Sequence, residues 1–261
     1  MAPSTLPLLT ARLRSAGCVF AEEEAALILA TARTAAERTA MTEQRSAGLP
    51  LEHVLGWAEF CGLRLHLAPG VFVPRPRTAL LARRAAALLT PASVAVDLCC
   101  GSGALGAVLA RTHPGLTLHA ADIDPASVAC ARRNLPAHHV HRGDLYDALP
   151  ATLRGRVHVL VANVPYVPTD QIPLLPAEAR LHEHPRALDG GTDGLDLVRR
   201  LAAHATDWLT PGGHLLTEVN PRQLPAAEDA LTRGGLTCTT HTSPDQDTAV
   251  LTGTRPASTL R

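Results

Sequence analysis

The chain has 261 residues, of which 46% are hydrophobic and 18% are charged, a composition that indicates a folded globular protein and excludes disorder. Its 24 basic residues, all arginine, equal its 24 acidic residues, so it lacks the basic excess typical of proteins that bind long nucleic acids. No stretch approaches the ~20 consecutive apolar residues that span a bilayer, so we expect no membrane segment.

The cysteines and histidines do not form a recognisable framework. The six cysteines include no C-x-x-C pair, and no apolar signal stretch opens the sequence, so we expect reduced thiols in a cytoplasmic protein. The histidine-rich segments 138–141 and 182–184 lack the spacing that places two metal ligands on one turn of a helix. We therefore expect no metal site.

The sequence divides into three expected parts. Residues 1–57 are predicted to form a small helical domain, because apolar side chains recur there at helical spacing. Residues 58–76 are predicted to form a β-hairpin linker, with apolar alternation from Phe60 to Val73 interrupted by turn residues. Residues 77–261 are predicted to form a Rossmann-like domain. Pro74 and Pro76 stiffen the backbone at the end of the linker, and Thr78 is expected to cap a helix over 79–89.

Strands and helices then alternate. The expected strands are 94–97, 117–121, 140–141, 157–162, 214–219, 236–240 and 248–253, and the expected helices are 104–111, 125–135, 193–209 and 223–233. A turn is expected at 211–213, and the last two strands should form an antiparallel pair because no helix separates them. This order predicts an α/β fold: a doubly wound, mostly parallel sheet that binds ligands beyond the carboxyl ends of its strands.

A glycine-rich turn follows the first of these strands. Gly101 and Gly103 let the backbone approach a ligand closely, near the free N–H groups of the next helix. Asp97 precedes the glycines, where it would repel a pyrophosphate and attract a cationic amine. This arrangement favours S-adenosylmethionine over NAD, with an unliganded crossover turn as the alternative. We expect Cys99 and Asn163 to line the same donor site.

Polar residues also end the following strands. Asp122 stands about 20 residues beyond the turn, where a carboxylate can accept both ribose hydroxyls, and Ile123 is expected beside it. Asp144 can accept a hydrogen bond from the adenine amine while Leu145 covers the ring. The alternatives are a solvated loop acid for Asp122 and a helix N-cap for Asp144.

The tetrapeptide from Asn163 to Tyr166 is the expected catalytic centre. The Asn163 side-chain oxygen and the Val164 carbonyl, held by Pro165, present two acceptors side by side, as a planar NH2 group requires. Tyr166 can form a wall against that group. Holding both N–H bonds would aim the nitrogen lone pair at a sulfonium methyl, and alignment contributes much of the rate of such a transfer. A simple proline turn is the alternative.

These motifs resemble the protein-glutamine N5-methyltransferases that modify peptide-chain release factors. The similarity rests on Pro-Arg-Pro-x-Thr (74–78), Asp-Leu-x-x-Gly-Ser-Gly (97–103), Asp122, Asp144, Asn-x-Pro-Tyr (163–166) and Ala-Leu-Asp-Gly-Gly-x-Asp-Gly-Leu (187–195). The segment 48–56 also resembles the family. The resemblance implies a class I methyltransferase fold, S-adenosylmethionine as donor, and a glutamine amide held by Asn163 and the Val164 carbonyl.

The sequence departs from the family in ways that bear on the acceptor. Val164 stands where the family usually has proline, Arg77 stands where it usually has glutamate, and the helical domain is short. We expect a protein loop with an exposed glutamine, as on a release factor, to contact Arg75 and Arg77, and the Arg77 charge to favour an acceptor with a nearby acidic group. The alternative methyl acceptors are a small amide or amine and an adenine N6 amine in nucleic acid. A non-catalytic binding module is the alternative to an enzyme.

Overall fold

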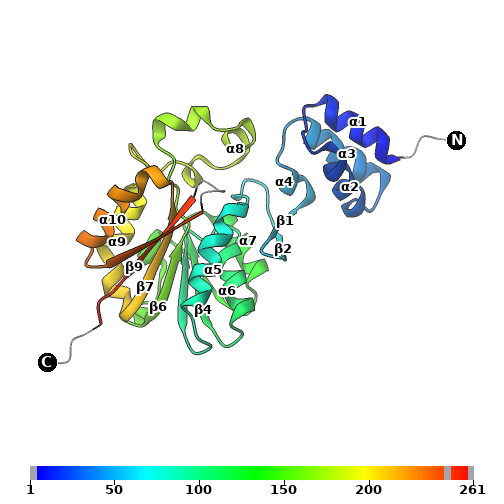
Figure 1. Cartoon of the computed structure of the whole chain (residues 1–261). Helices are drawn as coiled ribbons and strands as arrows, with labels where there is room; N and C mark the ends of the chain where they lie inside the picture. Colours follow the sequence, from blue (N-terminus) through cyan, green and yellow to red (C-terminus); the bar gives the residue numbers. More distant parts are fainter. Residues whose placement is uncertain (1–4, 244–247, 258–261) are drawn as a thin grey trace.

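The computed structural model describes residues 5–243 and 248–257, so the outermost residues of the predicted terminal domains lie outside the described part. The chain opens with four helices, α1 (Thr5–Ser15), α2 (Ala21–Thr31), α3 (Ala35–Ser46) and α4 (Leu51–Leu55), which form a bundle at one end of the molecule (Figure 1). Thr34 caps α3 by accepting the N–H of Glu37 at 3.1 Å. Buried apolar side chains fill the bundle: Leu13, Cys18, Ala21, Ala25, Ile28 and Leu55.

A short antiparallel hairpin follows the bundle. It comprises β1 (Trp57–Phe60) and β2 (Leu63–His66), joined by a two-residue turn at Cys61 and Gly62, both with positive φ, as tight hairpins favour. The predicted hairpin extended to Val73 and was too long. Residues 67–75 form no strand, because Leu67, Val71 and Val73 bury their side chains in a small cluster instead of alternating across a sheet.

The sheet that follows has seven strands in the order β5-β4-β3-β6-β7-β9-β8, and β9 runs antiparallel to both neighbours. This confirms the predicted doubly wound α/β fold. The strands are β3 (Val94–Leu98), β4 (Thr117–Asp122), β5 (His139–Arg142), β6 (Val157–Ala162), β7 (Leu209–Val219), β8 (Thr237–Ser243) and β9 (Thr248–Thr254).

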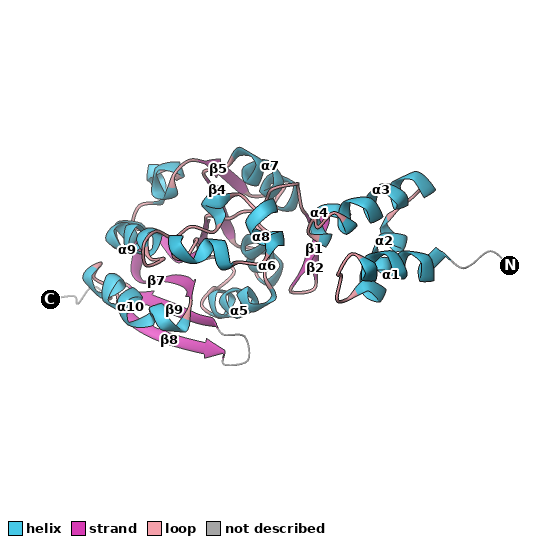
Figure 2. Cartoon of the chain, turned by 90° about the horizontal axis from the view of Figure 1, so that it is seen from above, coloured by secondary structure: helices cyan, strands magenta, loops and turns pink. Residues whose placement is uncertain are grey.

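Helices cover both faces of the sheet (Figures 1 and 2). One face packs on α5 (Ala79–Ala87), α6 (Ala104–Thr112) and α7 (Pro125–Asn134), and the other on α9 (Asp196–Trp208) and α10 (Leu224–Arg233). Short 3-10 turns lie between these elements: η1 (Pro76–Thr78), η2 (Leu145–Ala148), η3 (Ala151–Leu153) and η6 (Pro221–Gln223). None of the described helices is both long and apolar enough to cross a membrane.

Two local predictions were wrong. Thr78 makes no side-chain cap for α5, because it belongs to the 3-10 turn η1 and its hydroxyl lies near Asn163 instead. The expected turn at 211–213 is part of β7, which starts at Leu209 and whose pairing with β6 shifts at this point. Gly212 and Gly213 bond to the backbone of Arg255, so this stretch stays on the sheet.

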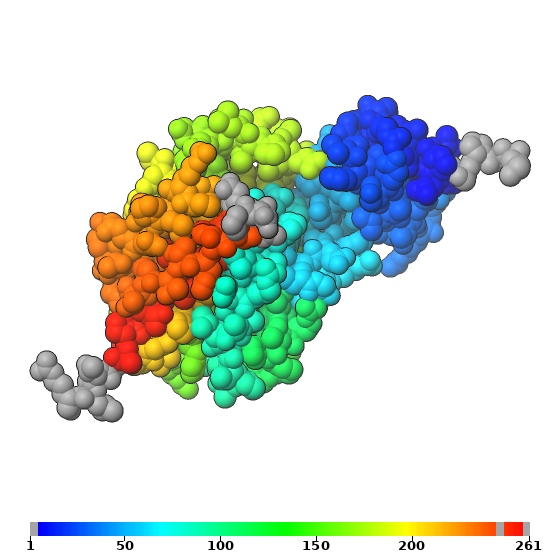
Figure 3. All heavy atoms as spheres, viewed as in Figure 1, coloured from blue at the N-terminus to red at the C-terminus, as the bar shows by residue number. Residues whose placement is uncertain are grey.

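A long connection between β6 and α9, residues 167–195, crosses the carboxyl ends of the strands, and we call it the strap. It contains η4 (Thr169–Leu174), α8 (Ala177–His182) and η5 (Pro185–Ala187). The strap, green in Figure 3, meets the blue helical bundle, where Arg45 donates to Glu178 at 2.6 Å. Arg45 also pairs with Glu24 inside the bundle at 2.6 Å. The strap is therefore held by both parts of the molecule.

Candidate active site

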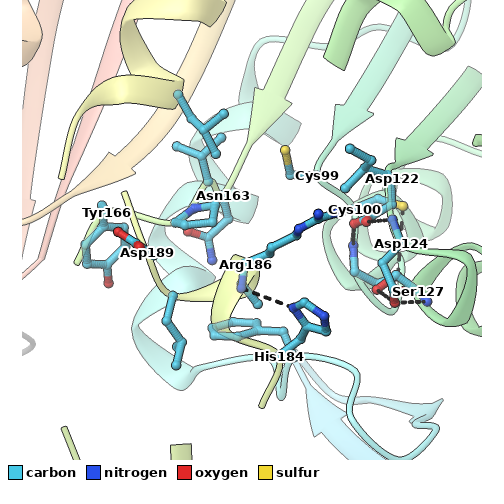
Figure 4. A pocket seen from close by; sticks show the side chains of 18 of the residues that line it. Cys99, Cys100, Asp122, Asp124, Ser127, Asn163, Tyr166, His184, Arg186 and Asp189 are labelled. Carbon is cyan, nitrogen blue, oxygen red and sulfur yellow. Dashed lines mark hydrogen bonds between the residues drawn. The ribbon is translucent and has the colours of Figure 1, made fainter. Parts of the chain in front are cut away.

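A cavity of about 1220 Å³ lies beneath the strap, at the carboxyl ends of β3, β4, β5 and β6 (Figure 4). Typical pockets for one small ligand measure about 300–1,000 Å³, so this cavity can hold a nucleoside-sized molecule together with part of a second reactant. Most of the predicted site residues line it: Cys99, Gly101, Asp122, Ile123, Asp144, Leu145, Asn163, Val164, Pro165, Tyr166, Arg75 and Arg77.

The loop between β3 and α6 forms one wall. Cys99 and Gly101 have positive φ values of 55° and 52°, which turn the backbone sharply. The N–H of Gly101 donates to the Asp122 carboxylate at 2.9 Å, and the N–H of Asp124 donates to its other oxygen at 2.9 Å. Burial raises the pKa of Asp122, and these two hydrogen bonds oppose that rise. The loop and the Asp122 carboxylate are therefore fixed together before any ligand arrives.

Asp97 lies beneath this loop and does not line the cavity. It is fully buried; one carboxylate oxygen accepts the N–H of Gly106 at 2.9 Å, and the other, Oδ1, has no hydrogen-bond partner among the described residues. Burial raises its pKa to about 7. Gly103 is also absent from the cavity wall. It caps the start of α6 with a φ of 78°, and a side chain there would meet Leu135.

The opposite end of the predicted donor site is partly apolar. Leu145 is buried and Ile123 is 45% exposed, and both face the cavity. The Asp144 carboxylate pairs with Arg200 at 2.7 Å, a contact that the sequence did not predict. Burial, and then the nearby Asp122 charge, raise the pKa of the Cys99 thiol, so Cys99 contributes a neutral surface.

The Asn163 tetrapeptide forms a second wall, facing the glycine-rich loop across the cavity (Figure 4). The Asn163 amide nitrogen donates to the Thr78 hydroxyl at 3.4 Å, which leaves its oxygen Oδ1 as an open acceptor. No described residue donates to the Val164 carbonyl. The two acceptors that the sequence predicted are thus both unoccupied by protein donors.

The Gly-Gly-x-Asp-Gly segment packs directly behind this wall. The N–H of Gly190 donates to the Val167 carbonyl at 2.9 Å, and the Gln223 side chain donates to the Tyr166 carbonyl at 2.8 Å. Gly194 has a φ of 78°, and a side chain there would come within 2.2 Å of the Tyr166 carbonyl oxygen. The glycines therefore allow the strap backbone to clamp the tetrapeptide.

Both predicted substrate arginines are already paired with buried carboxylates. The Arg75 guanidinium contacts both oxygens of Glu183 at 2.7 Å. Arg77 donates to Glu218 at 3.2 Å, and the Tyr166 hydroxyl donates to the same carboxylate oxygen at 3.0 Å. The expectation that Arg77 offers an open positive charge to an acidic acceptor is therefore wrong. The roles of Arg75 and Arg77 in binding remain predictions.

Several groups that shape the cavity were missed by the sequence analysis. Glu183 and Glu218 anchor the two arginines from distant segments, and His184 and Arg186 line the cavity from the strap. The strap has no strong helical or strand periodicity that would have placed these side chains. Only the resemblance of residues 187–195 to a motif of the family indicated that the strap is functional.

The described residues contain no group of three or more His, Cys, Asp or Glu side chains positioned to hold a metal ion. The nearest arrangement is a stack of His119, His139 and His141 on β4 and β5, in which His119 Nδ1 lies 2.9 Å from His141 Nε2. Burial lowers the pKa of His119 to about 4, so the His119 ring is neutral at pH 7. The expected lack of a metal stays a prediction.

Comparison with known proteins identifies related enzymes. A family model for the methyltransferase small domain matches residues 63–192. A release factor glutamine methyltransferase of Streptomyces coelicolor is 40% identical over 183 residues, 67% of this chain and 64% of that protein. The enzyme of the same name from Geobacter sulfurreducens is 32% identical over 209 residues, 78% of this chain and 72% of that protein. The match thus spans less than two thirds of the S. coelicolor protein.

A further relative has a different name. The 4-amino-L-phenylalanine/4-methylamino-L-phenylalanine methyltransferase of Streptomyces pristinaespiralis is 39% identical over 184 residues, 67% of this chain and 62% of that protein. Among solved structures, a methyltransferase from Pyrococcus furiosus aligns with a TM-score of 0.58 and 17% identity, covering 85% of this chain and 99% of that one. This structure supports the methyltransferase fold alone.

Proposed function

Because the chain belongs to the release factor glutamine methyltransferase family, we propose that it uses S-adenosylmethionine to methylate the side-chain amide nitrogen of a glutamine in a protein. The observation that carries this proposal is the pair of open acceptors, Asn163 Oδ1 and the Val164 carbonyl, facing the glycine-rich loop in one cavity. A cytoplasmic location, as expected from the sequence, is part of the same proposal.

The residues of the first wall suit the donor. When bound, S-adenosylmethionine supplies a methyl group on a positively charged sulfur. Gly101 has no side chain, which keeps this wall free of bulk there, and the Asp122 carboxylate, fixed by two backbone N–H groups, suits a ribose diol. When Asp97 is ionised, its unpartnered Oδ1 adds negative potential beneath the loop, which favours a cationic amine above it. Ile123 and Leu145 offer apolar surface for a base.

The second wall suits a planar NH2 group. Asn163 Oδ1 and the Val164 carbonyl can each accept a hydrogen bond from one N–H of the NH2 group. These two bonds fix the nitrogen and exclude water from it. Tyr166 is held by its hydrogen bond to Glu218, and burial, followed by the Glu218 charge, raises the pKa of its phenol. Tyr166 therefore stays neutral and acts as a fixed wall beside the acceptor rather than as a base.

The aromatic ring amine of a free amino acid is a second candidate methyl acceptor. The relative from S. pristinaespiralis is named for such a substrate, and an aromatic amine presents the same planar NH2 group to the two acceptors. The pairing of Arg77 with Glu218 also differs from the family pattern, in which a carboxylate stands at position 77. This candidate is the small-amine alternative raised by the sequence.

The test compares acceptors directly. Purified enzyme is incubated with methyl-labelled donor and either a release factor with an exposed Gly-Gly-Gln loop or 4-amino-L-phenylalanine, with N163A as control. We expect labelled glutamine, located by mass spectrometry, that N163A does not produce. Labelling of the free amine alone would favour the second candidate. Donor binding without turnover on either acceptor would contradict both and support a non-catalytic binding module, and labelled adenine in added nucleic acid would support the remaining alternative.

A further inference from the structure

Most of the arginines that line the cavity are paired with carboxylates. Among the basic side chains that line it, Arg75, Arg77 and Arg200 each contact a carboxylate within 3.2 Å. Arg186 differs, because no acidic side chain of the described residues lies within 4 Å of its guanidinium. Arg142, at the end of the edge strand β5, also has no such partner within the described part of the chain. The cavity lining therefore includes two arginines without an ion-pair partner among the described residues, beside acidic residues such as Asp122 that also have none there.

Arg186 is placed to use this charge inside the cavity. Figure 4 shows its side chain extending from the strap toward the loop that carries Cys99 and Cys100, on the side where Asp122 lies. A guanidinium presents a planar fork of N–H donors that matches both oxygens of a carboxylate. The ligand group that Arg186 would bind in the cavity is thus expected to be a carboxylate.

The backbone that carries Arg186 is fixed on both sides. Its own N–H donates to the His184 ring at 3.1 Å, and the N–H of Ala187 donates to the His184 carbonyl at 2.8 Å. Just before this turn, the Glu183 side chain is held by Arg75. Just after it, Asp189 forms a backbone β-bridge with Val167. Little backbone ordering is needed for Arg186 to bind, which lowers the entropic cost of a contact with a ligand.

We propose that Arg186 binds the carboxylate of an amino-acid moiety in this cavity. The inference rests on the proposed function, which supplies two sources of that group: the methionine end of the donor, or an acceptor that is itself a free amino acid. A glutamine within a protein has no α-carboxylate, so the source that Arg186 recognises also bears on the acceptor class.

The donor arm of the test measures binding alone. Calorimetry compares S-adenosylhomocysteine with its decarboxylated analogue, which keeps the amine and the nucleoside, on wild type, R186Q, R186K, R142Q and R180Q. Arg180 is a matched control because it is exposed on the same strap and does not line the cavity. If the donor is the source, R186Q weakens S-adenosylhomocysteine binding about 10- to 100-fold, R186K restores part of it, and the decarboxylated analogue binds all variants equally.

The acceptor arm compares 4-amino-L-phenylalanine with 2-(4-aminophenyl)ethylamine at saturating donor. If the acceptor is the source, R186Q raises KM only for the molecule with a carboxylate, and donor binding does not change. The proposal is overturned if R186Q matches R180Q with both pairs of ligands, if it weakens decarboxylated ligands equally, or if only R142Q shows the carboxylate-dependent loss. Failure of the proposed function is distinguishable, because it would appear as absent turnover while the donor-binding result still stands.

Discussion

The two walls of the cavity are built differently. The wall formed by the loop between β3 and α6, which we call the donor wall after its proposed role, comes from consecutive β-α units. Its central contact joins Gly101 to Asp122, 21 residues apart. The Asn163 tetrapeptide and the two paired arginines beside it, which we call the acceptor wall after their proposed role, are assembled over long distances. Arg75 meets Glu183 across 108 residues, and Arg77 meets Glu218 across 141. Local chain geometry fixes the donor wall, whereas packing of the whole domain fixes the acceptor wall. Substitutions in the donor wall should therefore mainly weaken donor binding, and substitutions in the acceptor wall should mainly reduce turnover.

The largest separation is expected for N163A. Removing Oδ1 deletes one of the two hydrogen-bond acceptors that we propose for the substrate nitrogen, and loss of such positioning should reduce turnover about 100-fold or more. Donor affinity should stay within about twofold of wild type, since Asp122 and the glycine-rich loop are untouched. Initial rates and calorimetry with S-adenosylhomocysteine measure the two quantities. A parallel fall in both would show that the tetrapeptide is structural.

The converse separation is expected for D122A. The Asp122 carboxylate, which we propose binds the ribose, is held by the N–H groups of Gly101 and Asp124, so its loss should weaken donor binding by about 1.5–3 kcal/mol, or roughly 10- to 150-fold. Turnover at saturating donor should change much less. D124A, which removes the α7 cap on Ser127, is a control for loop disruption. Unchanged donor affinity in D122A would remove Asp122 from the donor site.

A smaller, pH-dependent effect is expected from Asp97. Its pKa of about 7 in the folded protein lies above its ordinary value of 3.8, so the folded state holds the proton more tightly. This group therefore stabilises the fold fully below about pH 4, and that contribution is lost as the pH rises to about 7. A cationic donor favours the ionised form, so donor affinity should rise about tenfold from pH 6 to pH 8. Calorimetry should show this slope in wild type and not in D97N; equal slopes would contradict it.

The smallest effect concerns the stability of the acceptor wall. R77E would set a second carboxylate beside Glu218, whose side chain is 1% exposed and already has one unpartnered oxygen. Because Arg77 is itself 42% exposed, we expect a loss of only about 1–2 kcal/mol in the free energy of unfolding. Adding E218Q to R77E should restore most of it. Denaturant titration of the two single variants and the double variant checks this, and strictly additive losses would show that the two residues are not coupled.

The sequence predicted the elements whose signals are local. β6 was placed at 157–162 as observed, and Pro125 and Asn134 bound α7 close to the predicted range, because an apolar run and a helix cap are both encoded by neighbouring residues. The start of β7 was missed, since Pro211 and two glycines read as a turn while contacts with Arg255 keep them on the sheet. Long-range pairing overrode the turn signal there.

The same distinction explains the site. Asp122, Asp144 and Asn163 could be predicted because each ends a parallel strand, and such ends meet at one edge of the sheet. Whether a charge near that edge is open or neutralised depends on a partner that is distant in the sequence. Arg77 was for this reason predicted to be available, while Arg186, which has no acidic partner among the described residues, was overlooked.

The ion pair between Arg45 and Glu178 has a consequence for engineering this scaffold. Arg45 is buried in the helical bundle and Glu178 lines the cavity from α8, so one side chain of the bundle is bonded to the roof of the cavity. A chimera that exchanged the bundle alone would leave α8 without this anchor. Transplanting acceptor selectivity between relatives should therefore succeed only when α3 and α8 travel as a pair.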